Sequence, residues 1–151
     1  MRPLPEHRHI PGVNARHPEG AFDDIRCAAD EVTASEDASG NAAWVHGLAL
    51  FNAGFWWEAH EVWEEVWMRA PDGSSEKAMV QAAIQLANAA LKVLMGKPKA
   101  TRRLCAIVEE KALEAGDAMG LSSDAVIGRA KALSASLNVD KVRLEWREGA
   151  G

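Results

Sequence analysis

Residues 55–68 concentrate ionisable side chains whose types and spacing could carry chemistry. His60 and Glu64 stand one helical turn apart, and Glu61 is next to His60 in the chain. An imidazole can exchange a proton near neutral pH, and a carboxylate one turn away can orient it. His60, Glu61 and Glu64 are therefore the candidate catalytic residues. The His60-Glu61 pair also matches the first half of the HExxH zinc motif, but Glu at position 64 removes the second imidazole.

A second polar feature interrupts the otherwise apolar helix predicted over 75–95. Its members follow i, i+4, i+7 and i+11 spacing and fall within about 60° of arc. A buried amide without a partner costs about 1–3 kcal/mol, so such a stripe faces either solvent or other polar groups. We expect it to meet the His60/Glu64 edge of the preceding helix and to enclose a small polar pocket there. The four residues are Gln81, Gln85, Asn88 and Lys92.

The predicted ligand-binding set also includes Trp57, which lies beside His60 and outside the main apolar arc of the helix. No cofactor is expected, and no metal site is assigned because a complete ligand set is missing. Three acidic side chains, Glu58, Glu61 and Glu65, cluster opposite the apolar face and are expected to form a solvated stripe. The predicted ligand-binding residues are Trp57, His60, Glu61, Glu64, Gln81, Gln85, Asn88 and Lys92.

Helical periodicity from Asn41 to Leu137 predicts an all-α fold, a compact bundle of about five helices built from two αα-hairpins. Gly54 and Gly96 end the first helix of each hairpin. Trp63 and Trp67 lie on an apolar helical face and are expected in the core. The predicted helices cover 41–53, 55–68 and 75–95, then one from Pro98 and one from Ser122 or Ser123, with a short helix from Asp23 or Asp24 and a loop over 35–40.

Residues 1–20 hold four of the six prolines and three of the five histidines. Proline fixes φ and lacks a backbone donor, so this segment cannot form a continuous helix. We expect an extended Pro-rich N-terminal arm over 1–20, followed by a single helical domain over 21–151. The tail over 139–146 alternates apolar and polar residues, which favours an extended segment.

Composition excludes several classes of protein. The chain has 151 residues, 48% of them hydrophobic, which fits one soluble domain rather than a disordered chain. No apolar run is long enough for a signal peptide or a membrane span. Cys27 and Cys105 are expected to be free thiols, which favours the cytoplasm. A net charge of −5 argues against nucleic acid as a partner, despite a basic turn at 97–103.

The string from Leu50 to Glu64, LFNAGFWWEAHEVWE, followed by Gln81-x-x-Ile84-Gln85, resembles the prokaryotic family described as "domain of unknown function 309". The resemblance implies a small all-helical bundle and no established activity. Lys92 departs from the family pattern, in which many members carry His. A looser similarity around Gly54 is to a tetratricopeptide-type helical hairpin, whose concave face would bind peptides.

These observations leave three functions open. The leading hypothesis is a small cytoplasmic helical bundle whose polar pocket binds an unidentified small ligand or protein partner. The first alternative is a non-catalytic interaction adaptor or homodimer, in which the polar cluster is only structural. The second is a hydrolase-like or metal-dependent enzyme that uses His60 with Glu61 or Glu64. Whether the protein is an enzyme is left open by the sequence.

Overall fold

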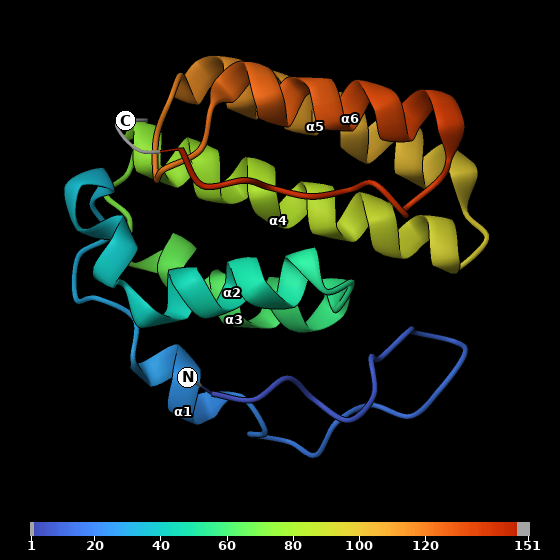
Figure 1. Cartoon of the computed structure of the whole chain (residues 1–151), viewed down its shortest axis with the longest axis horizontal. Coiled ribbons are helices and arrows are strands. Elements are labelled where there is room, and N and C mark those ends of the chain that lie inside the picture. The colour runs from blue at the N-terminus through green and yellow to red at the C-terminus, as the bar shows by residue number, and fades with distance from the viewer. Residues whose placement is uncertain (1, 148–151) are drawn as a thin grey trace.

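The computed structural model describes residues 2–147, and over these residues the chain is all-α, as the periodicity predicts, with no strand. The outer ends of the predicted arm and domain, residues 1 and 148–151, lie outside the described residues. The helix α4 runs through the middle, with α5 and α6 on one side and the α2–α3 hairpin on the other (Figure 1). The elements are α1 (Asp23–Cys27), the 3₁₀ helix η1 (Ser35–Gly40), α2 (Ala42–Asn52), α3 (Trp56–Met68), α4 (Ser75–Leu94), α5 (Pro98–Ala115) and α6 (Ser123–Ser136).

Local sequence explains where these helices begin and end. Asn41 caps α2 by accepting the Trp44 amide proton at 3.4 Å, and Ser74 caps α4 by accepting that of Lys77 at 3.1 Å. After α2 and α4 the chain turns at Gly54 and Gly96, both with positive φ, which allows each helix to be followed by an antiparallel neighbour. Only the loop expected over 35–40 differs, because these residues form the 3₁₀ helix η1.

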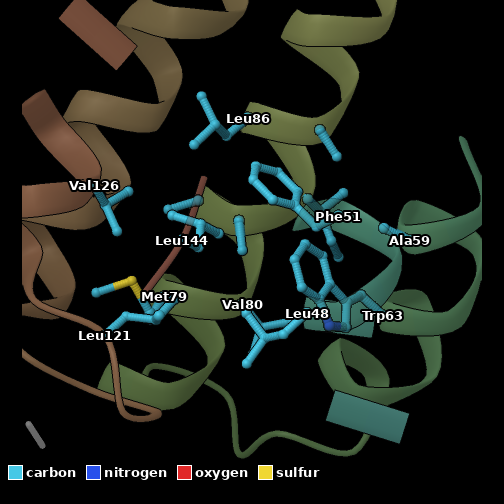
Figure 2. Close-up of a cluster of buried hydrophobic side chains, with 14 of the residues drawn as sticks. Leu48, Phe51, Ala59, Trp63, Met79, Val80, Leu86, Leu121, Val126 and Leu144 are labelled. Atoms are coloured by element: carbon cyan, nitrogen blue, oxygen red, sulfur yellow. The ribbon is translucent and has the colours of Figure 1, made fainter. Parts of the chain in front are cut away.

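Aromatic rings pack together in the core between α2, α3 and α4, and Figure 2 shows those of Phe51 and Trp63. The indole of Trp63 is fully buried and lies 5.0 Å from the Trp44 ring and 5.6 Å from the Phe51 ring, centre to centre. The core prediction is thus confirmed for Trp63. Trp67 is only partly buried: its ring packs against the edge of the core, and Lys77 Nζ lies 4.2 Å from the ring centre.

The hairpin of α2 and α3 closes so tightly that one position admits only glycine. A Cβ atom added at Gly47 would overlap the indole nitrogen of Trp63. That nitrogen donates a hydrogen bond to the Trp44 carbonyl at 3.2 Å, which fixes the ring in place. The close approach therefore sets the position of α3, the helix that carries most of the candidate site residues.

The tail beyond α6 returns across α4 as an extended segment without regular structure, as its alternation predicts. Val142 and Leu144 are buried. Asn52 of α2 donates to the Leu144 carbonyl and accepts from its amide, both at 2.9 Å. No helix among residues 2–147 combines the length and apolar character needed to cross a membrane.

One buried histidine makes no hydrogen bond through its ring within the described residues. His46 of α2 is 3% exposed, and neither ring nitrogen makes a hydrogen bond within the described chain. Burial lowers the pKa of His46 below its usual value of 6.5, and the nearby charge of Arg2 lowers it further, while Asp24 acts in the opposite direction. The folded protein therefore holds this imidazole in its neutral form.

The Gly47→Ala variant tests the close approach of α2 and α3. We expect its free energy of unfolding to fall by about 1–3 kcal/mol or more, because the added methyl displaces Trp63. The matched control is Gly128→Ala in α6, where the added Cβ meets nothing within 4 Å. That control should stabilise the protein by about 0.4–1 kcal/mol. Equal urea unfolding curves for the two variants would contradict the packing described.

The His46→Leu variant tests the buried imidazole. Below about pH 6.5 the unfolded chain binds a proton at His46 that the folded chain does not, so the wild type loses stability as the pH falls. The leucine variant lacks this loss. Its free energy of unfolding, relative to wild type, should rise between about pH 7.5 and pH 5.5, since other titrating groups cancel in the difference. A difference that stays constant with pH would show that His46 is not buried in its neutral form.

Candidate functional site

The predicted catalytic residues lie together on the outer face of α3. His60 Nε2 is 3.5 Å from Glu64 Oε2, and His60 Nδ1 is 3.8 Å from Glu61 Oε1. One ligand atom from each of the three side chains can be chosen so that all lie within 4.8 Å of one another. The exposed fractions of these side chains are 27% for His60, 25% for Glu61 and 44% for Glu64, so the cluster is open to solvent.

The polar stripe of α4 is half-buried along its whole length. Asn88 donates to the Gln85 side-chain oxygen at 3.3 Å. Gln81 lines a shallow recess shared with Lys111 of α5. Within residues 2–147 no hydrogen bond joins these amides to His60, so a pocket enclosed by both sets remains a prediction.

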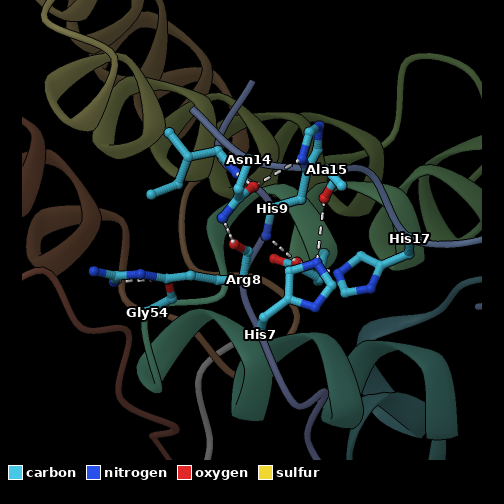
Figure 3. A network of polar contacts seen from close by, with 9 residues as sticks. His7, Arg8, His9, Asn14, Ala15, His17 and Gly54 are labelled. Atoms are coloured by element: carbon cyan, nitrogen blue, oxygen red, sulfur yellow. Dashed lines mark hydrogen bonds and ion pairs between the residues drawn. The ribbon is translucent and has the colours of Figure 1, made fainter. Parts of the chain in front are cut away.

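The acidic stripe predicted opposite the apolar face of α3 needs a correction at its first member. Glu58 is completely buried, whereas Glu61 and Glu65 are partly exposed. The physical reason is the N-terminal arm, which folds across the first turn of α3 and covers this carboxylate (Figure 3). The position suits a negative charge, because the first turn of a helix presents unpaired backbone N–H groups.

Two donors from the arm hold one oxygen of the buried carboxylate. Glu58 Oε2 accepts the backbone N–H of His9 at 2.7 Å and a hydrogen bond from His17 Nε2 at 2.6 Å. Its other oxygen, Oε1, is sealed from solvent and makes no hydrogen bond within the described chain. A buried carboxylate whose hydrogen bonds are only half made costs free energy, so Oε1 marks a place where a further donor would be favourable.

The arm that reaches Glu58 is ordered by its own contacts, which Figure 3 shows. Asn14 closes a loop by accepting the Ile10 amide proton at 2.9 Å and donating to the Arg8 carbonyl at 2.8 Å. The buried ring of His9 donates to the Asn14 side-chain oxygen at 3.3 Å. This loop places His9 and His17 over the same carboxylate, although eight residues separate them.

Aromatic rings surround the His17–Glu58 pair. The His17 ring lies 5.2 Å from Phe22 and 5.9 Å from Trp57, centre to centre. Beside it is a recess of about 230 Å³ between the arm and α3, lined in part by Trp57, Arg16 and Glu61. A carboxylate that orients an imidazole next to a recess is an arrangement used for proton transfer and for binding polar ligands.

The arm residues of this site, His9 and His17, were not among the predicted site residues. The usable signal was the concentration of histidine and proline in residues 1–20, which is hard to explain for a segment without contacts. The helical wheel assigned Glu58 to the solvated face because it describes a helix alone and does not include a covering arm.

Both cysteines are free thiols, and they differ in reactivity. Cys27 is exposed at the end of α1, whereas burial, with a smaller effect of Glu109, raises the pKa of the Cys105 thiol to about 11. Since the thiolate is the nucleophile, Cys105 is unreactive at neutral pH.

Comparison with known families confirms the resemblance seen in the sequence. Residues 44–104 match the family model described as "Domain of unknown function (DUF309)". The matched segment spans α2, α3 and α4 and the start of α5, so it includes the His60 cluster and Glu58 but not the arm. No curated protein matches the chain.

The Glu58→Ala variant tests whether the buried carboxylate holds the arm. We expect the free energy of unfolding to fall by about 1–3 kcal/mol, because the His9 amide and His17 lose their common acceptor. Trypsin should then cleave faster after Arg8 and Arg16. The control is Glu110→Ala, an exposed carboxylate of α5, for which we expect a change within about 0.5 kcal/mol. Unchanged cleavage of the arm in Glu58→Ala would contradict the assigned role.

Proposed function

We propose that this all-helical protein, with its DUF309 segment over residues 44–104, binds a small polar ligand at the edge of α3 that carries His60, Glu61 and Glu64. The proposed site includes the half-buried polar stripe of α4 as its second wall. Binding rather than catalysis is the proposed role. The full set of proposed ligand-binding residues is Trp57, His60, Glu61, Glu64, Gln81, Gln85, Asn88 and Lys92.

The single observation that carries the proposal is the convergence of one imidazole and two carboxylates, with ligand atoms within 4.8 Å. The sequence provided no metal assignment, because the second imidazole of a zinc motif is missing. We propose that a divalent cation is bound here and that the small polar ligand binds with it, since His60 and Glu64 at i and i+4 present ligand atoms from adjacent helical turns. His60 Nδ1 is sealed from solvent and makes no hydrogen bond within residues 2–147, so Nε2 is the more accessible ligand atom.

A neighbouring guanidinium partly neutralises the charge of the His60, Glu61 and Glu64 cluster. Arg26 of α1 lies 3.7 Å from Glu61 and 3.6 Å from Glu65. Its charge reduces the negative potential that a cation would meet, so the cluster should bind a transition-metal ion with only moderate affinity. A site with three protein ligands also leaves coordination positions for water or for a ligand that binds with the metal.

The cytoplasm is the proposed location, on the ground that Cys27 and Cys105 are free thiols and fit a reducing compartment. The division into an arm over 1–20 and a helical domain over 21–151 belongs to the same proposal. It is supported by the way in which the arm meets the helical domain: His9 and His17 form hydrogen bonds with Glu58, and the arm itself forms no helix.

Calorimetric titration of the full chain with Zn²⁺ tests this function. We expect saturable binding with one ion per chain, and His60→Ala should weaken it by about tenfold or more, because it removes a ligand. The matched control is His7→Ala, which removes an exposed imidazole from the arm and should leave the affinity unchanged. Absence of saturable binding, or equal weakening by both substitutions, would exclude the cluster as a metal site.

A further inference from the structure

The recess between the arm and α3 is lined by a cationic side chain of the chain itself, that of Arg16. Trp57 forms its aromatic wall, and His17 lines it from the arm side. The Arg16 guanidinium lies 5.6 Å from the centre of the Trp57 ring. Guanidinium and ammonium groups are attracted to the face of an indole in this way. The contact of Arg16 with Trp57 therefore indicates that a cationic group suits this aromatic wall.

A buried carboxylate lies close to the recess, behind one of its lining residues. Glu58 lies directly behind His17, is wholly buried and has an unpartnered Oε1. His17 donates to this carboxylate through Nε2 and also lines the recess, so its imidazole lies between the two. Glu58 does not line the recess and its Oε1 is sealed from solvent, so this carboxylate acts on a ligand in the recess only through its charge, which favours a cation.

The charge around the recess points in the same direction. Three carboxylates line it, from Glu19, Asp23 and Glu61, against the guanidinium groups of Arg16 and Arg26. Arg26 is already paired with Glu61 at 3.7 Å. If Arg16 moves away from Trp57, the carboxylates of Glu19 and Asp23 remain, and the recess carries a negative charge. That charge would repel a phosphate or carboxylate ligand.

We propose that this recess binds a small organic cation, one that carries a primary ammonium or guanidinium group and takes the place of Arg16 on Trp57. The indole face holds the cation, and the buried Glu58 carboxylate supplies negative charge behind it. Arg16 acts as an internal competitor of the ligand. The inference goes beyond the proposed metal cluster, because it requires neither His60 nor Glu64.

The competition by Arg16 gives the sharpest test. Calorimetric titration of the full chain uses agmatine, which carries both a guanidinium and an ammonium group, as the probe. Arg16→Ala should tighten agmatine binding by about threefold or more, the equivalent of one cation–π contact at an exposed site. The matched control is Arg8→Ala, which removes the same charge from an exposed arm residue whose guanidinium contacts the Gly54 carbonyl instead. That control should leave the affinity for agmatine within about twofold of wild type.

A second variant tests the aromatic wall. Trp57→Leu should weaken agmatine binding by about threefold or more, with circular dichroism used to confirm that the helices are retained. Three outcomes would overturn the proposal: no saturable heat with agmatine, equal tightening by Arg8→Ala and Arg16→Ala, or preferential binding of inorganic phosphate. Zn²⁺ titration of the Arg16→Ala protein separates the two sites, because binding at His60 should be unchanged whatever agmatine does.

Discussion

The carboxylate of Glu58 is removed from water completely, and the arrangement of the arm depends on that fact. A charge in this position is tolerable only if hydrogen-bond donors reach it. The donors come from the arm, as the His9 amide and the His17 imidazole, which bond the same oxygen at 2.7 and 2.6 Å. Closure of the arm then creates the recess beside Trp57. The burial of this one charge thus accounts both for the position of the arm and for the recess beside Trp57.

The position of α3 is the second requirement, because this helix carries Glu58 on one side and the His60 cluster on the other. The contact of Trp63 with Gly47 fixes the helix against α2, and its core face is fully buried. With that face committed to packing, the remaining faces are available for polar side chains. One helix therefore supports two candidate sites, which share Trp57 and Glu61 at their border.

Most of the fold follows from local signals in the sequence. The caps at Asn41 and Ser74 and the glycines after α2 and α4 mark helix ends that depend only on neighbouring residues. The grouping of His60 with Glu61 and Glu64 is equally local. The burial of Glu58 is not, because it results from a segment more than forty residues away in the chain. Helical periodicity describes one helix, and a covering arm without periodicity leaves no such signal.

The central claim is that Glu58 holds the arm closed in the folded protein, and amide hydrogen exchange at His9 measures this directly. The His9 N–H donates to a buried carboxylate in a segment that has no helical or strand hydrogen bonds of its own. The account predicts that this amide exchanges much more slowly than an unstructured peptide, and that Glu58→Ala abolishes the protection. Exchange of the wild-type His9 amide at the rate of an unstructured peptide would contradict it.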